Sequence, residues 1–453
     1  MNTSGKTVRW LIWIYFWLLI FEGALRKWIL PGLSTPLLLV RDPVVVAIYL
    51  MAISERRLPR TVFIPWILGL AIACSLASLS GQGNIGVTIF GLHANFLHLP
   101  LIFIIPQYFD AAEVRRVGKW VLLVLLPMAV LATLQFRAGP DARLNVGVGG
   151  EIGGQLFAAA GKVRASGTFS FVTGLVSFLS LAAAFLCYDL LEKRVYPRLL
   201  VLAALPALIL AMGVSGSRSA VMAVSVVFAC VGLVCLVRWE KFGRAFLQFV
   251  LIYAVYMGLS RVSTFREGIE VQRTRFESGG GLKVGIVERY FSDFSSAIVA
   301  MDQAPFLGYG LGLGTNAGAA YVSGIRGFLL AEGEWSRVIL ESGPILGPMY
   351  LLLRVAIIGY AFRKGWGALR FGQGLPMLLM GMSGLEMLTG QFGQSASLGF
   401  AVLGMGLTLA ATNFSNAEKP IPEYLVSAPP APALRGRSRY AEALHGELPA
   451  HDS

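Results

Sequence analysis

The sequence predicts an all-α protein that crosses a membrane many times. Apolar residues make up 56% of its 453 residues and charged residues only 14%, and the mean hydropathy is +0.68. This composition is too apolar for a water-soluble fold. The chain also contains many apolar runs of about 17–25 residues, the length that spans a bilayer core. We therefore expect a polytopic bundle of about twelve transmembrane helices.

The expected spans follow one another along most of the chain. The first resembles a signal peptide, but residues 22–28 offer no small-residue cleavage site, so we interpret it as a retained helix. Arg41, Asp42 and Pro43 interrupt the second. The spans are 10–25, 36–53, 61–80, 87–106, 118–137, 168–188, 198–214, 218–237, 243–260, 335–361, 373–390 and 395–412.

Basic residues in short loops predict the orientation, because such residues mark the cytoplasmic side of a membrane protein. Five sets occupy alternate loops, so both termini are expected in the cytoplasm. The net charge of +13 then reflects topology and not nucleic-acid binding. The sets are Arg56, Arg57 and Arg60; Arg115, Arg116 and Lys119; Lys193, Arg194 and Arg198; Arg238, Lys241 and Arg244; and Arg363, Lys364 and Arg370.

Two long connections, 138–167 and 261–334, fall on the outer side in this topology. The second is long for a structureless link, so we expect it to form short helices that cap the membrane domain. Residues 413–453 are rich in Pro, Ala and Arg, which predicts a disordered cytoplasmic tail. The membrane domain is therefore expected to cover residues 1–412.

Charged residues that do not set the orientation gather on the outer side. Arg218 lies in a turn of a few residues between two spans, where a helix N-terminus favours an anion. A helix that begins near Glu334 would place Glu334, Arg337 and Glu341 on one stripe that descends about 10 Å. Such groups usually face a bundle interior or a wet cavity. Gly343 and Gly347 form a small-xxx-small pair that lets a neighbour pack closely.

Each charged position also has a simpler interpretation. Arg26 and Arg41 fit snorkelling anchors at helix ends equally well. Glu332 and Glu334 could equally pair with neighbouring arginines.

The remaining motifs predict no metal and no cofactor. The cysteines lie in apolar segments without metal-ligand spacing, and a packing or hydrogen-bonding role is favoured for both membrane histidines. The glycine-rich 308–314 segment (GYGLGLG) lacks the preceding strand and the GK[ST] ending of a phosphate loop. The residues concerned are Cys74, Cys187, Cys230, Cys235, His93 and His98.

Several segments resemble the O-antigen ligase and O-antigen polymerase superfamily of bacterial membrane glycosyltransferases. They are 164–169 (RASGTF), 215–220 (SGSRSA), 305–317 (PFLGYGLGLGTNA) and 332–347 (EGEWSRVILESGPILG). The segment 22–28 (EGALRKW), with Arg41 and Asp42, is similar to an N-terminal element of polymerase-like members. In ligases a His–Asn pair precedes the glycine that corresponds to Gly343. Glu332 and Gly333 stand there in this chain, which favours the polymerase branch.

The resemblance implies a GT-C-like fold for 1–412, with 261–334 as a large periplasmic loop, in the inner membrane. It implies polymerisation of polyprenyl-diphosphate-linked oligosaccharides by inverting, metal-independent transfer. Arginines would neutralise the leaving diphosphate, because a guanidinium binds it bidentately and stays charged. A carboxylate would accept the acceptor's proton. The expected catalytic residues are Glu332, Glu334 and Arg218, and the expected substrate-binding residues are Arg164, Arg273, Arg275, Arg289, Arg337, Arg26 and Arg41.

Other functions remain open from the sequence. A ligase would transfer the glycan to a lipid or another acceptor. A transporter or flippase for the same lipid would carry its charges along a mid-membrane path between repeated halves. A scaffold in a polysaccharide export complex is a third class. The expected partners of the polymerase are its lipid-linked substrate, membrane lipid, a flippase and a chain-length regulator.

Overall fold

A computed structural model describes residues 3–81, 84–159, 161–192, 194–278, 293–324 and 329–413. Across these residues the fold is helical, and the only extended pairing that they form is an isolated antiparallel bridge between Phe157 and Val163. The prediction of an all-α protein is therefore confirmed for this part of the chain.

The first half contains α1 (Thr3–Ala24), α2 (Asp42–Ser54), α3 (Phe63–Gly81), α4 (Ile85–Leu92), α5 (Leu101–Tyr108), α6 (Ala111–Arg137) and α7 (Val172–Leu191). Two short π-helices, η1 (Leu25–Ile29) and η4 (His93–Leu97), continue α1 and α4. The second half contains α8 (Arg198–Val214), α9 (Arg218–Val237), α10 (Phe242–Leu259), α11 (Ser263–Ser278), α13 (Asn316–Ser323), α14 (Glu334–Arg370), α15 (Leu375–Thr389) and α16 (Ser395–Ala410).

Eight helices of the described residues are long and apolar enough to cross a membrane, so the chain is a multi-pass membrane protein. A pair of segments, Ile85–Leu97 and Leu101–Tyr108, is bent by 44° and would give a ninth span. Three shorter apolar helices are Arg198–Val214, Leu375–Thr389 and Ser395–Ala410. Every expected span falls on one of these elements. The number that crosses the bilayer stays a prediction.

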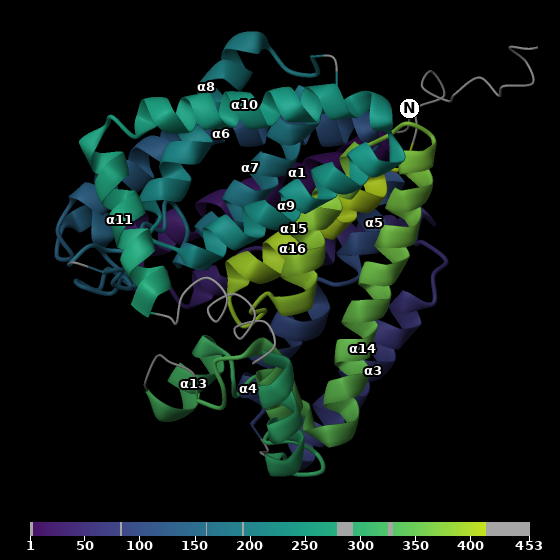
Figure 1. The fold of residues 1–453 in the computed structure, drawn as a ribbon. Coiled ribbons are helices and arrows are strands. Elements are labelled where there is room, and N and C mark those ends of the chain that lie inside the picture. Colours follow the sequence, from purple (N-terminus) through teal and green to yellow (C-terminus); the bar gives the residue numbers. More distant parts are fainter. Residues whose placement is uncertain are drawn as a thin grey trace, which may run out of the picture. The chain divides into compact units, whose positions relative to one another are not determined.

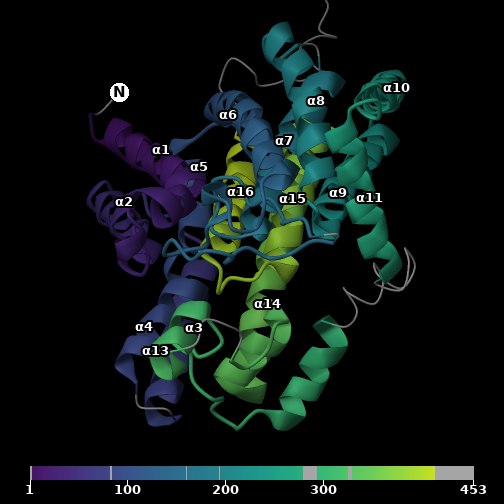
Figure 2. The ribbon, with the colours of Figure 1, turned by 90° about the vertical axis from the view of Figure 1, so that its left-hand side faces the viewer.

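The centre of the bundle is formed by α7, α15 and α16. These three helices pack against one another, α9 and α14 flank α15, and α5 flanks α16 (Figures 1 and 2). Almost every side chain of α7 and α16 is buried. Helices that are apolar around their whole circumference belong inside a bundle. The termini of these central helices therefore have fixed positions, and the polar groups described below lie at those termini.

The element α14 begins at Glu334 as expected, but it is not one continuous helix. Gly343 has φ 82° and ψ 172°, which breaks the helical backbone, and Pro344 follows. The break brings Gly347 against Ile339. A Cβ added at Gly347 would lie only 2.9 Å from the Cα of Ile339. The expected span 335–361 lies within this element, which is long and apolar enough to cross a membrane, and the break at Gly343 divides it. The neighbour that packs on Gly347 is the preceding segment of the same element.

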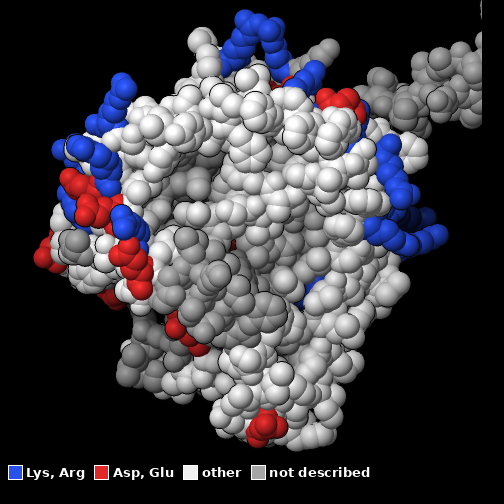
Figure 3. Space-filling view, viewed as in Figure 1, with Lys and Arg blue, Asp and Glu red and all other residues white. Residues whose placement is uncertain are grey.

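The long connection after α10 contains short helices, as its length predicted. They are α11, a helical segment at 293–303 and α13. On the face shown in Figure 3, Lys and Arg gather along the upper and right edges, with mixed charges on the left over α11. Between them the described residues on this face are mostly uncharged (Figure 3), as expected for a surface that contacts lipid. The side of the membrane that holds 261–334 stays a prediction.

Candidate functional site

A cavity of about 250 Å³ lies at one end of the central helices. Its wall combines segments that are far apart in sequence: the end of α1 with η1, residues 34–38, residues 169–171, the start of α13, and residues 393–396. Its polar lining includes Glu22, Arg26 and Ser395. The cavity therefore joins the N-terminal 22–28 segment to the 164–169 and 305–317 segments.

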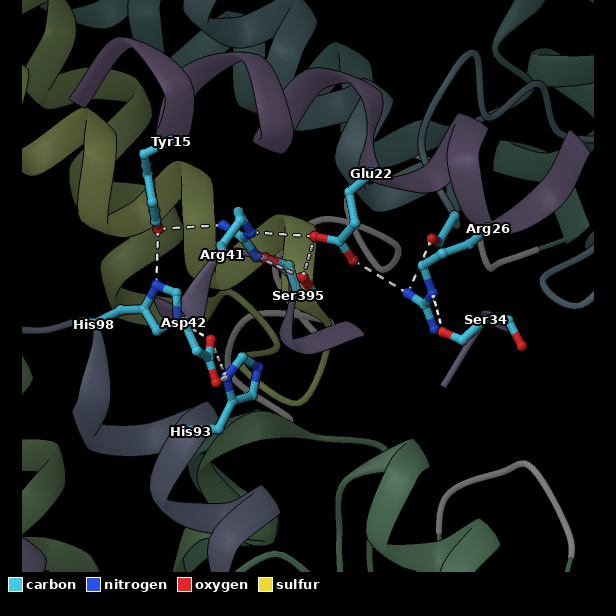
Figure 4. Close-up of polar contacts among 10 residues, drawn as sticks. Tyr15, Glu22, Arg26, Ser34, Arg41, Asp42, His93, His98 and Ser395 are labelled. Carbon is cyan, nitrogen blue, oxygen red and sulfur yellow. Dashed lines mark hydrogen bonds and ion pairs between the residues drawn. The ribbon is translucent and has the colours of Figure 1, made fainter. Parts of the chain in front are cut away.

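Glu22 is the centre of the polar contacts beside this cavity (Figure 4). Its Oε1 accepts a hydrogen bond from Nη1 of Arg26 at 3.2 Å, and its Oε2 accepts one from Nε of Arg41 at 3.1 Å. The Ser395 hydroxyl donates to Oε2 at 2.7 Å. Nη2 of Arg41 also donates to the carbonyl and the hydroxyl of Ser395. Two cations thus share one carboxylate, which leaves this group of three ionic side chains with a net positive charge.

The local sequence explains how α1 reaches this position. Gly23 lies against the backbone of residues 168–170, and a Cβ at Gly23 would overlap those atoms. The π-helix η1 turns Lys27 toward the same segment, where its Nζ donates to Ser166 Oγ at 3.0 Å and to Gly167 O at 2.8 Å. A larger residue at position 23 would push α1 away and separate Arg26 from the Ser170 hydroxyl, which it contacts at 3.2 Å.

Three arginines lie at or beside the turn between α8 and α9. Arg218 is the first residue of α9. Nη1 of Arg275, on α11, donates to Gly216 O at 2.6 Å. A Cβ at Gly216 would lie 3.8 Å from Cγ of Arg164. We call Arg164, Arg218 and Arg275 the arginine turn. A helix N-terminus adds partial positive charge to these groups, so the turn is suited to an anion.

The start of α7 connects the arginine turn to the cavity. Val172 and Val176 pack against Ala220 and Ala223 near the start of α9. Thr173 hydrogen-bonds Gln394, a residue of the cavity wall. Both features therefore flank the same helix end.

Glu332 lies close to the same wall. Its backbone carbonyl accepts a hydrogen bond from Nε2 of Gln391 at 2.9 Å, and Gln391 accepts one from Gln394 at 2.5 Å. The Glu332 residue is exposed. An exposed carboxylate on a residue whose backbone lies near the cavity wall is open to a substrate hydroxyl.

Glu334 belongs to a different, fully buried network. Its Oε1 accepts from Arg354 Nη1 at 2.7 Å and from Arg337 Nη2 at 2.9 Å. Arg337 also donates to Glu341 at 2.7 Å and to Asn95 at 2.9 Å. All four ionic side chains are at most 3% exposed. Two carboxylates balance two guanidinium groups, so this network can remain charged inside a membrane domain.

The glycine-rich 308–314 segment closes over the break in α14. The backbone N–H groups of Tyr309 and Gly310 donate to the carbonyls of Leu340 and Glu341, at 2.7 and 3.1 Å. The N–H of Gly314 donates to Oε1 of Glu341 at 2.8 Å. Gly308 and Gly312 have positive φ and lie so close to neighbouring backbone that a Cβ would overlap it. These N–H groups bind protein acceptors, so the segment has a structural role here.

Comparison with models of known protein families gives no match to this chain. Comparison with curated proteins gives none either. One solved structure, described as structural coordination of polymerization and crosslinking by a peptidoglycan synthase complex, is similar over 77% of this chain and 96% of that one. The TM-score is 0.38 and the identity 15%. So small a similarity carries no argument about activity.

In the structure, the residues expected to bind substrate fall into separate groups. Arg26 and Arg41 flank Glu22, Arg164 and Arg275 belong to the arginine turn, and Arg337 is enclosed in the buried network. Arg273 is exposed on α11 and pairs with Glu277 at 2.8 Å, and this hydrogen bond raises the pKa of Arg273. Arg289 lies outside the described residues.

Some polar residues of these groups were not expected. Arg354 is a single arginine in the middle of an apolar run, and its guanidinium lies 3.8 Å from the centre of the Phe392 ring. A lone arginine at that depth is itself a sequence signal, because a charge inside a membrane requires a partner. Tyr15 and Ser395, which both contact Arg41, carried no such signal, since serine and tyrosine are common in membrane helices.

Proposed function

We propose that this protein is a membrane glycosyltransferase that polymerises saccharides carried on a polyprenyl diphosphate, at the outer face of a bacterial inner membrane. One observation supports this best. The arginine turn, the cavity and Glu332 come from segments spread over most of the chain, and all of them lie around the N-terminal end of α7. A cationic group beside a largely apolar cavity with a few polar groups suits a lipid that carries an anionic head group and a sugar.

In this proposal the arginine turn holds the diphosphate of the donor. Guanidinium groups neutralise two phosphates without losing their own protons, and their planar donors match phosphate oxygens in pairs. The diphosphate gains negative charge as its bond to the anomeric carbon breaks. Cations placed at that position stabilise the transition state more than the ground state. No divalent ion is needed at the diphosphate for this step.

The cavity holds the sugar end, and Glu332 takes the proton of the acceptor. The acceptor hydroxyl oxygen forms a bond to the anomeric carbon while the bond from that carbon to the diphosphate oxygen breaks. The hydroxyl proton passes to the Glu332 carboxylate, and the electron pair leaves with the lipid diphosphate. Glu332 suits this role better than Glu334, because both oxygens of Glu334 already accept hydrogen bonds from arginines.

Reconstitution tests the proposal. Purified protein in liposomes receives a polyprenyl-diphosphate-linked oligosaccharide, and the products are separated by length. The expected result is glycan lengthening on the lipid. Transfer of the glycan to another lipid acceptor would identify a ligase. Movement of the lipid across the bilayer without lengthening would identify a flippase. A scaffold would give neither product.

A further inference from the structure

Asp42, His93 and His98 form a compact cluster that the proposed reaction does not use. Nδ1 of His93 lies 2.9 and 2.8 Å from the two carboxylate oxygens of Asp42, and Nε2 of His98 lies 3.0 Å from Oδ1. One donor atom from each residue lies within 4.8 Å of the other two. Two imidazoles and a carboxylate are a common donor set for divalent transition metals.

The backbone brings the two histidines to one side. His93 begins the π-helix η4 and His98 follows its last residue, so they are five positions apart. In an α-helix a separation of five residues would point them about 140° apart. A π-helix has hydrogen bonds from i to i+5 and a wider turn, which brings such residues closer around the axis, and short π segments are frequently found at functional sites. The irregular backbone therefore serves to direct both rings at Asp42.

Tyr15 supplies the outer contact that a metal-binding histidine requires. Its hydroxyl lies 3.0 Å from Nδ1 of His98, the ring nitrogen that does not face Asp42. Metal-bound histidines almost always donate their other N–H to a fixed acceptor, which sets the tautomer. The Tyr15 oxygen can accept from His98 Nδ1–H, and Nε2 then has its lone pair directed at the cluster.

A metal ion can reach the cluster, and the charge around the cluster favours a cation. The Asp42 side chain is 17% exposed, whereas His98 is fully buried. The neighbouring cation, Arg41, already pairs with Glu22 at 3.1 Å. An incoming cation therefore meets the negative charge of Asp42 and the nitrogen donors of two imidazoles, and the charge of the nearest guanidinium is already balanced by Glu22.

We propose that Asp42, His93 and His98 bind a divalent transition-metal ion of the Zn²⁺ or Fe²⁺ type. Bonds of about 2.0–2.1 Å at tetrahedral angles place donor atoms about 3.3 Å apart. The present histidine–aspartate separations of 2.8–3.0 Å are slightly shorter than this, and all three donor atoms lie within 4.8 Å of one another, so small ring rotations bring them to metal-binding distances. Three protein donors leave a coordination position for water or substrate.

A bound ion would connect two parts of the membrane domain. Asp42 begins α2, and both histidines belong to the η4 region. Arg41 directly precedes Asp42 and contacts Glu22 at the cavity, so the ion would also fix the position of Arg41. This inference does not depend on the proposed function, because metal content can be measured without substrate.

The test uses the full chain with an affinity tag that contains no histidine. The protein is stripped with a chelator, incubated with Zn²⁺ in one arm and with Fe²⁺ under anaerobic conditions in the other, desalted, and analysed for metal by mass spectrometry. We expect one ion per chain, a higher melting temperature with the preferred metal, and a visible absorption band when Co²⁺ replaces it. The two arms distinguish Zn²⁺ from Fe²⁺.

The variants H93N, H98Q and D42N keep side-chain shape and polarity at the cluster but remove a metal donor. Each should lose the bound ion and the metal-dependent rise in melting temperature while it elutes as wild type in size-exclusion chromatography. The matched control H445N/H451N replaces the other two histidines of the chain and should retain the ion. The proposal is overturned if the wild-type protein retains neither metal, or if the control loses the ion. Since the wild-type measurement needs no variant, poor folding of a variant cannot hide this result.

Discussion

The guanidinium group of Arg41 occupies the space in front of Gly399. A Cβ at Gly399 would overlap Nη1 of Arg41, and Arg41, which directly precedes α2, is fully buried between α1 and α16. The only side chain that leaves room for this arginine at position 399 is therefore the hydrogen atom of glycine. This contact connects the first turns of α16 to the ionic contacts of Glu22.

Gly399→Ala should displace Arg41 and weaken the whole group. Overpacking of a filled interior costs about 1–3 kcal/mol, and the displaced guanidinium would lose its contacts with Glu22 and Ser395. We expect a lower melting temperature in detergent and lower polymerase activity. Gly359→Ala is the matched control, because Gly359 is also helical and has no atom within 4 Å of its Cβ position. Equal melting temperatures for the two variants would contradict this account of Gly399.

Arg354→Met should destabilise the protein strongly. The substitution leaves the buried Glu334–Arg337–Glu341 group with an extra negative charge, and removal of one partner from a buried pair costs about 3–5 kcal/mol. The double variant Glu334→Gln/Arg354→Met restores neutrality and should recover part of the melting temperature. Arg363→Met, an exposed position on the same element, should change stability by about 0.5 kcal/mol or less. No recovery in the double variant would show that charge balance is not the cause.

Glu332→Gln should slow transfer and leave folding unchanged. The amide keeps the shape of the exposed side chain but cannot accept the proton, and loss of a general base typically lowers turnover by about 10²-fold or more. Donor binding should stay near normal, so the loss appears in kcat. Glu334→Gln should instead lower the melting temperature, because it leaves two buried guanidinium groups with less negative charge. Asp302→Asn, at an exposed carboxylate of the same long connection, is the control. Normal turnover in Glu332→Gln would remove Glu332 from the reaction.

Arg218→Lys and Arg275→Lys should each reduce polymer synthesis by about tenfold or more. An ammonium keeps the charge but loses the paired planar contact with phosphate, and a charge-assisted hydrogen bond contributes about 1.5–3 kcal/mol. Expression and elution in size-exclusion chromatography should match wild type. Arg266→Lys, at an exposed site on α11, should keep full activity. Activity near wild type in both turn variants would assign these arginines to electrostatic anchoring.

Cysteine labelling tests the orientation. In a variant that lacks the four native cysteines, a single cysteine at Ser278 should react in whole cells with a thiol reagent that cannot cross the membrane. A cysteine at Ser438 should react only after the cells are opened. The reverse pattern would invert the topology inferred from the basic loops.

Much of the fold could be predicted from the sequence, because the length of an apolar run is a direct consequence of bilayer thickness. All twelve expected segments fall on helices or on the bent pair. The pairing within Glu334, Arg337 and Glu341 also followed from helical spacing. These features are local, so a single segment contains the information.

The arrangement of the charges could not be predicted in the same way. Arg41 forms hydrogen bonds with Glu22 and Ser395 only after helices that are distant in sequence have packed together. The same holds for the hydrogen bond from Arg275 to Gly216. The break at Gly343 was also missed, since a glycine followed by a proline inside an apolar run fits either a kinked span or a turn. The five-residue spacing of His93 and His98 did not indicate a shared site, because the π-helical backbone that directs both rings at Asp42 has no clear sequence signature.

The hydrogen bonds between the glycine-rich segment and the break in α14 determine which parts of the domain can move. If residues 309–310 moved away, the carbonyls of Leu340 and Glu341 would lose their partners, at a cost of about 1–3 kcal/mol for each buried group. Glycines with positive φ often suggest a flexible flap, but here Gly308 and Gly312 allow close backbone contacts. This side of the domain is therefore a fixed wall. In the proposed reaction, the lipid-linked glycan would approach along this wall without opening it.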